Sequence, residues 1–283
     1  MHDFIADVPY LDLLTQHTKR NVSFALEEDI QSGDITAQLI DENALCKARV
    51  ITRENAIVCG VAWVNETFAQ FDDNVKITWF VKDGDKVKPN QTLFELAGNS
   101  RSILTAERTA LNFLQLLSAT ATLANQFNEA ILNKNTTILD TRKTIPGLRM
   151  AQKYAALVGG CGNHRIGLYD MFLIKENHIA ACGSIEKAIS KARNLYPNKR
   201  IEIEVENEVE LQQALLCEPD VIMLDNFHIK GQFNIDRTKT KLESSGNITL
   251  DTLAAFKEDV DFVSSGQITK NVTAIDLSLR LID

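Results

Sequence analysis

From residue 135 to the C-terminus, short apolar segments alternate with helical patterns, and this alternation restricts the fold more than any other feature. Six segments read as strands, at 136–140, 171–175, 200–206, 220–225, 241–246 and 261–266. Helical spacing of apolar residues separates several of them, at 147–160, 184–197, 208–216 and 249–259. Strands joined through helices run parallel, so we expect an incomplete parallel α/β barrel (TIM-like). An open doubly wound sheet is the competing fold, but no G-x-G-x-x-G motif opens a helix.

The N-terminal part has a different pattern and predicts a separate α+β domain. A helix is expected over 9–27, and strand-like segments follow at 48–53, 56–64, 75–81 and 92–98. A long helix is expected from Ala106 to about residue 133, with Thr105 as N-cap and Arg108 near its positively polarised end. We therefore expect domains at 1–110 and 111–283, the last strand or helix being a candidate to return to the first domain.

Composition excludes several functional classes. The net charge of −8 argues against nonspecific nucleic-acid binding, which needs a broad basic surface. No run of 18 apolar residues occurs, and the N-terminal segment has acids where a signal peptide has positive charge. We therefore expect a cytoplasmic protein that is not bound to a membrane. The five scattered cysteines do not suit a disulfide framework.

Residues 140–178 form a positively charged segment in this acidic chain. The segment holds six Lys or Arg side chains, two histidines and only three acids. Because its cations lie where apolar segments end, we predict a pocket for a ligand with several negative charges. Zinc-ligating residue types also occur, at Cys161, His164, His178 and Cys182. Their spacing fits no familiar zinc module, so we expect small buried thiols instead.

The ends of the six strands carry the candidate site, because barrel enzymes place active-site groups at the C-terminal ends of their strands. In chain order there are two cationic ends, two carboxylate ends and two small-residue ends that contain glycine. The candidate residues are Thr141, Arg142, Lys143, Lys175, Glu204, Asp225, Ser245, Gly246, Asn247, Ser265, Gly266 and Gln267.

Segment 201–206 alternates aliphatic residues with Glu202, Glu204 and Glu206, which places the three acids on one face of a strand. That face is either solvated, on a half-exposed strand, or turned into a parallel barrel, where carboxylates need a metal or cations. Asp225 ends the next apolar strand, where an acid without a partner is costly. Glu204 and Asp225 together predict a Mg²⁺ site, since Mg²⁺ prefers oxygen ligands completed by substrate phosphates.

The two Ser-Gly ends predict phosphate contacts, because small residues and exposed backbone N–H groups let a phosphate approach closely. One such dipeptide is an ordinary turn, but two at equivalent strand ends are informative. His164 is either a satisfied core histidine or a carboxylate contact, and its neighbour Arg165 and the preceding Gly-Gly-Cys-Gly turn favour the second. A polyanion pocket, a carboxylate pair for Mg²⁺ and a phosphate cradle together suit a phosphoribosyl diphosphate donor.

Several long motifs follow one another in a fixed order: TRKTIPGLR, GG-x-G-NHR, FLIKENH, IEIEVEN, IMLDN and SSGNI. Together with EDIQSGDIT and TAERTALNFLQ, they resemble the quinolinate phosphoribosyltransferase family over nearly the whole chain. The resemblance implies transfer of ribose 5-phosphate to the ring nitrogen of quinolinate, with loss of pyrophosphate and CO₂. The product would be nicotinate mononucleotide for NAD synthesis. Mg²⁺ would accompany the diphosphate, and no organic cofactor would be needed.

The resemblance also implies a homodimer, or a higher oligomer, in which the subunits complete each other's sites. By matching motif, the quinolinate pocket would be lined by Arg142, Lys143, His164, Arg165 and Lys175. Arg108 would reach in from the partner subunit. Glu204 and Asp225 would handle Mg²⁺ and the ribose, and the turns at Ser245 and Ser265 would hold the 5′-phosphate.

The sequence departs from the family pattern at two places that bear on phosphate affinity. Asn247 stands where a second glycine is common, and Lys270-Asn271 replaces a frequent His-Ser pair. Three other interpretations remain: a relative acting on another substrate, a carrier domain suggested by the biotinyl-like segment 81–98, and a non-catalytic phosphate-sensing barrel. The carrier interpretation leaves most of the chain unused. A non-catalytic barrel would be supported by loss of the carboxylate pair, but both acids are present.

Overall fold

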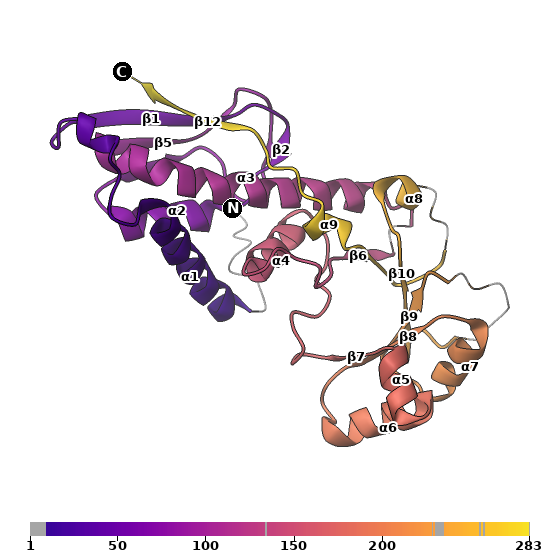
Figure 1. The fold of residues 1–283 in the computed structure, drawn as a ribbon. Helices are drawn as coiled ribbons and strands as arrows, with labels where there is room; N and C mark the ends of the chain where they lie inside the picture. Colours follow the sequence, from indigo (N-terminus) through magenta and orange to yellow (C-terminus); the bar gives the residue numbers. More distant parts are fainter. Residues whose placement is uncertain are drawn as a thin grey trace. The chain divides into compact units, whose positions relative to one another are not determined.

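The computed structural model describes residues 10–133, 135–227, 229, 235–254, 256 and 258–282 of the 283-residue chain. They form two compact units (Figure 1). The first contains the described residues of 10–125, 145–160 and 271–282, and the second those of 126–144 and 161–270. Helix α3 (Ser100–Ala130) continues from one unit into the other, and the boundary expected at residue 110 falls inside it.

The first unit is built on a four-stranded antiparallel sheet in the order β12-β1-β5-β3. Its strands are β1 (Leu45–Thr52), β3 (Lys76–Trp79), β5 (Thr92–Asn99) and β12 (Leu277–Ile282), and a two-stranded sheet joins β2 (Ala56–Ile57) and β4 (Lys86–Val87). The helical elements are α1 (Leu11–Ile30), η1 (Ala37–Leu39), α2 (Val61–Phe71), α4 (Arg149–Val158) and most of α3. The expected α+β class of this unit is confirmed, and β12 brings the C-terminal strand into its sheet.

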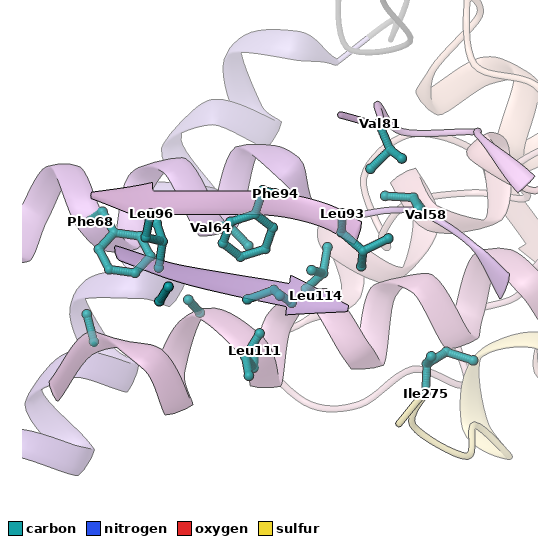
Figure 2. Packing of buried hydrophobic residues seen from close by; sticks show 14 of the residues in the cluster. Val58, Val64, Phe68, Val81, Leu93, Phe94, Leu96, Leu111, Leu114 and Ile275 are labelled. Atoms are coloured by element: carbon teal, nitrogen blue, oxygen red, sulfur yellow. The ribbon is translucent and has the colours of Figure 1, made fainter. Parts of the chain in front are cut away.

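A buried apolar cluster joins the sheet of the first unit to two of its helices. In Figure 2, Phe94 and Leu96 of β5 lie beside Leu111 and Leu114 of α3, with Phe68 of α2 also in the cluster. All five side chains are no more than 2% exposed. This hydrophobic burial is the main stabilising contribution to the unit.

Two predictions in this unit are wrong in detail. Helix α3 begins at Ser100 rather than Ala106, because the side chain of Asn99 accepts hydrogen bonds from the backbone N–H groups of Arg101 and Ser102. Thr105 is therefore not the N-cap; its hydroxyl donates to Asp34. The start at Ser100 also places Arg108 in the third turn of α3, away from the polarised end.

The strand-like segment 56–64 is only partly a strand. Strand β2 covers two residues, and helix α2 begins at Val61. Gly60 has a positive φ of 121°, and the carboxylate of Asp83 accepts hydrogen bonds from the backbone N–H groups of Gly60 and Val61. A continuous apolar run has no periodicity that separates a strand from a buried helix, so the sequence alone could not place this helix start.

The second unit contains a six-stranded parallel sheet in the order β6-β11-β10-β9-β8-β7. The strands are β6 (Thr137–Leu139), β7 (Phe172–Ile174), β8 (Ile201–Val205), β9 (Val221–Asp225), β10 (Lys241–Ser245) and β11 (Phe262–Ser264). Five helices accompany them: α5 (Glu176–Cys182), α6 (Ile185–Leu195), α7 (Glu208–Leu216), α8 (Leu250–Ala254) and α9 (Gln267–Lys270). All six predicted strands are confirmed.

The strand order identifies an incomplete barrel. Strands β7 to β11 follow one another without the reversal of order that defines a doubly wound sheet. Strand β6 pairs with β11, and within the described residues it makes no pairing with β7, so the barrel is open between these two strands. The predicted incomplete parallel α/β barrel is therefore confirmed, and the doubly wound alternative is wrong.

The alternating acids of β8 lie inside this unit. Every residue of β8 is buried, and Glu202 and Glu204 are 1% and 8% exposed. A parallel sheet is covered on both faces, which excludes the solvated alternative for these two acids. Glu206 lies beyond the strand end and is exposed.

Among the described residues, no helix has the length and apolar content that crossing a membrane requires. Residues 228 and 230–234, which belong to the segment 226–241, lie outside the described residues. The question of whether this segment covers the site therefore falls outside them as well.

Candidate active site

A cavity of about 470 Å³ opens at the C-terminal ends of the parallel strands in the second unit. The structure brings nearly all of the predicted site residues together around it. These are Thr141, Arg142, Lys143, His164, Arg165, Lys175, Glu204, Asp225, Ser245, Gly246, Asn247, Ser265, Gly266 and Gln267. Arg108 is not among the lining residues; it belongs to α3 in the first unit, where its side chain is exposed.

The charge of the cavity opposes that of the whole chain. Five cationic side chains line it, from Arg142, Lys143, Arg165, Lys175 and Lys270, against two carboxylates. The chain as a whole carries a net charge of −8. A concentration of cations in a concave site raises the local potential for anions, so this cavity suits a polyanionic ligand.

Lys175 and Glu204 form an ion pair across the ends of adjacent strands. The Nζ of Lys175 lies 2.5 Å from Oε2 of Glu204, and their side chains are 42% and 9% exposed. The backbone N–H of Lys175 donates to Nδ1 of His178 at 3.0 Å, as part of a capping box that starts α5. His178 therefore has a local role in fixing the backbone from which Lys175 extends.

The loop that carries His164 and Arg165 is fastened beside β6. Leu139 and Gly162 form a parallel bridge, and the carboxylate of Asp140 accepts the backbone N–H of His164 at 2.9 Å. The same carboxylate accepts the side-chain amide of Asn163 at 2.7 Å. A Cβ on Gly162 would lie 2.8 Å from Cδ2 of Leu139 and 3.2 Å from Cγ2 of Thr137, so a larger residue would require these neighbours to shift.

Below the cavity, the imidazole of His164 meets two buried carboxyl groups. Its Nδ1 accepts the backbone N–H of Arg165 at 2.8 Å. Its Nε2 lies 2.9 Å from Oε2 of Glu202 and 3.7 Å from Oε1 of Glu243. All three side chains are less than 10% exposed. The cluster therefore lies in a region where electrostatic contacts are strong.

The ionisation of the two carboxyl groups is perturbed by this environment. Burial raises the pKa of Glu202, which the charge of Arg165 opposes. Burial raises the pKa of Glu243 as well, and the neighbouring Glu202 raises it further. Each acid is therefore harder to ionise than an exposed carboxyl group.

The zinc group considered from the sequence does not form. Among the residues that the structure describes, the only cluster of three metal-ligating types is His164, Glu202 and Glu243. Burial raises the pKa of the Cys161 thiol to about 12, so this thiol is protonated and a poor metal ligand. All five cysteines are free, but only Cys59 and Cys161 are the buried thiols that were expected, and the other three are partly exposed.

The ends of β9 and β10 are joined by a side-chain amide bridge. The Nδ2 of Asn247 donates to Oδ1 of Asn226 at 3.1 Å, and the Nδ2 of Asn226 donates to Oδ1 of Asp225 at 3.3 Å. Gly246 has a φ of 100°, and a Cβ there would lie 2.3 Å from Oδ1 of Asn226. Asn226 thus packs against the glycine and orients the predicted metal carboxylate.

The second Ser-Gly turn is held against the first strand end. The hydroxyl of Ser265 donates to the carbonyl of Ile248 and accepts the backbone N–H of Gln267. The hydroxyl of Thr269 donates to the carbonyl of Lys143 at 2.8 Å. A Cβ on Gly266 would lie 2.7 Å from the Lys143 side chain, so the small residue leaves room for that cation.

Sequence reasoning missed several residues of this site. The cavity is also lined by Leu173, Met223, Asn226, Ile248, Thr249, Ser264 and Lys270. Lys270 was predicted only as a departure from the family pattern, without a role in the site. Asn226 was not predicted, although it directly follows the strand end at Asp225. Glu243, two residues before a predicted strand end, had no role either. A search of positions two before each strand end would have found it, because such positions share a face.

A parallel barrel with a cationic cavity, two carboxylates and two Ser-Gly turns at its strand ends defines an enzyme that acts on anionic small molecules. Comparisons with known proteins narrow this class. Residues 34–118 match the family model described as quinolinate phosphoribosyl transferase, N-terminal domain, and residues 120–280 match that of the C-terminal domain.

The chain is similar to named proteins and to solved structures over most of its length. It is 40% identical over 257 residues to a probable nicotinate-nucleotide pyrophosphorylase [carboxylating] of Bacillus subtilis, covering 89% of each chain. It is 35% identical to quinolinate phosphoribosyltransferase [decarboxylating] 2, mitochondrial, of Nicotiana glauca, covering 94% of this chain and 83% of that one. The structure of the nicotinate-nucleotide pyrophosphorylase from Francisella tularensis matches with a TM-score of 0.91 and 49% identity, over 100% of both chains. The chain belongs to the quinolinate phosphoribosyltransferase family.

Proposed function

We propose that this chain is a phosphoribosyltransferase that converts quinolinate and 5-phosphoribosyl 1-diphosphate to nicotinate mononucleotide, CO₂ and pyrophosphate in NAD biosynthesis. The observation that carries the proposal is the cavity in which five cations and two carboxylates meet at the strand ends. Both substrates are polyanions, and each needs several positive contacts. Relatives that share about a third to a half of their residues with this chain carry names for this reaction.

The acceptor would be held by the cations of the first two strand ends and the adjoining loop. Quinolinate is a dicarboxylate, and a guanidinium binds a carboxylate through two parallel hydrogen bonds. Arg142 and Arg165 suit this geometry, and Lys143 and Lys175 add point charges in the same cavity. His164 lines the pocket beside them.

The donor would lie across the later strand ends. The turns at Ser245–Gly246–Asn247 and Ser265–Gly266–Gln267 carry small residues, so a 5′-phosphate can approach their backbone N–H groups. Lys270 adds a cation on the same side of the cavity as the second turn, since it ends the short helix that follows. These features support a phosphate cradle.

Mg²⁺ fits the carboxylates of this cavity. Glu204 and Asp225 offer oxygen ligands there, and two protein carboxylates completed by substrate phosphates are typical of Mg²⁺ sites. When bound, Mg²⁺ would neutralise charge on the departing pyrophosphate. Asp225→Asn is expected to raise the Mg²⁺ concentration for half-maximal activity roughly tenfold, while a Lys191→Ala control on exposed α6 leaves it unchanged. An unaltered Mg²⁺ requirement in Asp225→Asn would remove this carboxylate from the metal site.

The residues supply positioning and electrostatics for the reaction. The ring nitrogen of quinolinate attacks C1 of the ribose as the bond from C1 to pyrophosphate breaks, and positive charge develops on the sugar. Glu204 or Asp225 would stabilise that charge, and Lys175 would stabilise the leaving pyrophosphate. The quaternary nitrogen then accepts the electron pair of the adjacent carboxylate as CO₂ leaves, and a proton replaces it on the ring. No organic cofactor is needed for these steps.

The chain would act as a homodimer or higher oligomer with shared sites. Arg108 supports this proposal, because it is an exposed cation in the third turn of a long helix and does not line the cavity. We also propose a cytoplasmic location, which the five free thiols support, since free thiols are typical of reducing compartments.

Incubation of the purified protein with quinolinate, phosphoribosyl diphosphate and Mg²⁺ tests the function directly. We expect nicotinate mononucleotide and CO₂ in equal amounts. Nicotinate in place of quinolinate should give at least tenfold less product, because it lacks the second carboxylate that a charged contact would hold. Equal or faster use of nicotinate would show that the chain serves a different acceptor.

A further inference from the structure

Both ring nitrogens of His164 face protein groups, which leaves neither nitrogen to bind an acceptor carboxylate. Nδ1 accepts the backbone N–H of Arg165 at 2.8 Å, and Nε2 lies 2.9 Å from Glu202. His164 nevertheless lines the cavity next to Arg165. Its ring therefore acts on the next residue of the chain rather than on the ligand.

The hydrogen bonds of His164 also show whether His164, Glu202 and Glu243 form a metal site or a contact between a histidine and two acids. A nitrogen that accepts a hydrogen bond carries a lone pair, so the ring hydrogen of neutral His164 is on Nε2. A protonated Nε2 has no lone pair for a metal, and it is the atom that faces Glu202 and Glu243. The cluster is therefore a histidine anchored by acids.

We propose that Glu202 and Glu243 are positioning residues that hold His164, which in turn fixes the backbone of Arg165 and directs its guanidinium to an acceptor carboxylate. This inference rests on the proposed function, because it names the quinolinate-binding group on which the buried acids act. Glu202 is the direct contact to Nε2. Glu243 lies farther from the ring, 3.7 Å from Nε2, so it is the second acid that faces His164, from the second strand along.

The position of the two acids supports a role in the site rather than in folding alone. Their side chains are only 1% and 2% exposed, and each lies two residues before a cavity residue, Glu204 or Ser245, on the same strand. Buried carboxyl groups are costly compared with apolar side chains of equal size. The charge of Arg165 acts on Glu202 as well, which places the guanidinium within electrostatic reach of the acids.

The test compares two substitutions at one position. Glu202→Gln keeps an oxygen that can accept from Nε2, whereas Glu202→Met keeps the size and removes the acceptor. We expect Glu202→Met to raise the KM for quinolinate roughly tenfold or more, with kcat and the KM for phosphoribosyl diphosphate within about twofold. Glu202→Gln should restore the quinolinate KM to within about threefold of the wild type. Glu243→Met should have a smaller effect than Glu202→Met, because Glu243 lies farther from Nε2 than Glu202 does.

A double-mutant cycle separates positioning from general damage. In an Arg165→Ala background, Glu202→Met should raise the quinolinate KM by less than about twofold, since the group it positions is gone. Ile203→Val, a buried change on the same strand, is the matched control and should leave both KM values unchanged. Thermal unfolding of every variant checks that it is folded. The proposal would be overturned if the effects of Glu202→Met and Arg165→Ala on the quinolinate KM were additive. It would also be overturned if Glu202→Met raised the KM values for quinolinate and phosphoribosyl diphosphate equally.

Nitrogen NMR of histidine-labelled protein gives a readout that needs no activity. The signal of His164, identified by its loss in His164→Asn, should show the neutral form with hydrogen on Nε2, and this signal should change in Glu202→Met. Hydrogen on Nδ1, or a stoichiometric transition metal that Glu202→Met releases, would overturn the proposal. If the wild-type protein had no activity with quinolinate, the proposed function would be wrong. The NMR result would still show whether the acids hold His164.

Discussion

Gly246→Ala is a sharp test of how the phosphate turn is built, because a methyl group there meets two separate obstacles. Gly246 has a φ of 100°, a conformation that residues with a Cβ rarely adopt. The new Cβ would also lie 2.3 Å from Oδ1 of Asn226, so the Asn226 side chain has to move. Movement breaks its hydrogen bonds with Asn247 and Asp225.

These two obstacles have separable magnitudes. Backbone strain at this φ costs about 1–2 kcal/mol. Loss of two partly exposed hydrogen bonds costs about 1–2 kcal/mol more, so Gly246→Ala should destabilise the protein by about 2–4 kcal/mol. Asn226→Ala alone loses only the hydrogen bonds, about 1–2 kcal/mol. In the double variant the overlap is gone, so its total should equal that of Gly246→Ala alone.

Urea unfolding of the three variants measures these free energies. The double variant should be about 1–2 kcal/mol more stable than the sum of the single effects predicts, which is the coupling expected of two residues in contact. Ile203→Val provides a control outside the turn, and its effect should add to that of Gly246→Ala. If Gly246→Ala and Asn226→Ala were additive, Asn226 would not be the obstacle, and the account of this turn would be wrong.

Three further outcomes are expected. Gly162→Ala should destabilise the protein by about 1–3 kcal/mol through overpacking, which thermal unfolding measures. It should also raise the quinolinate KM, because the loop that carries the acceptor cations must shift. An unchanged KM in steady-state kinetics would contradict this expectation. The hydroxyl of Ser102 lowers the pKa of Asp72 from 3.8, so their hydrogen bond stabilises the folded protein at neutral pH and this stabilisation is lost as the pH falls through the lowered pKa. The difference in unfolding free energy between wild type and Ser102→Ala should therefore vanish in acid. A difference that stays constant with pH would refute this assignment. Mixing Arg108→Ala chains with Lys175→Ala chains should restore part of the activity if sites are shared, and heterodimers that form without recovery would exclude sharing.

The barrel could be predicted because short strand-like segments that end in polar residues alternate with helical patterns. All six such segments are strands of one sheet, although β6, β7 and β8 are each two residues shorter than their patterns and β11 is three residues shorter. The start of α3 was missed because its first three residues, Ser100, Arg101 and Ser102, are polar. Their helical conformation depends on the Asn99 cap and on Asp34, which accepts from Thr105 across the fold. Helix ends decided by such contacts are not visible in periodicity.

The cavity could be predicted because strand ends of a parallel barrel converge, so residues far apart in sequence become neighbours by a known rule. That rule selects residues by position and charge, and it identified Arg142, Lys143, Lys175 and both cavity carboxylates. It could not identify Asn226, whose importance comes from contacts with Gly246 and Asn247 on the next strand end. Nor could it assign Glu243, which ends no strand and meets His164 only after the loop has folded back.

The two layers of this site explain why its buried acids are separate from the acids in the cavity. Side chains two residues apart on a strand share a face, so each strand-end residue has a second residue beneath it. On β8 the pair is Glu204 above Glu202, and on β10 it is Ser245 above Glu243. Strand β9 lies between them, and its Met223, which pairs in register with both Glu204 and Glu243, is an apolar side chain that cannot compete for the hydrogen bonds of the buried acids. The lower acids are thus available to His164, while Glu204 and Ser245 line the cavity. Substitutions in the lower layer should therefore change affinity through the position of upper-layer groups, and substitutions in the upper layer should change it directly.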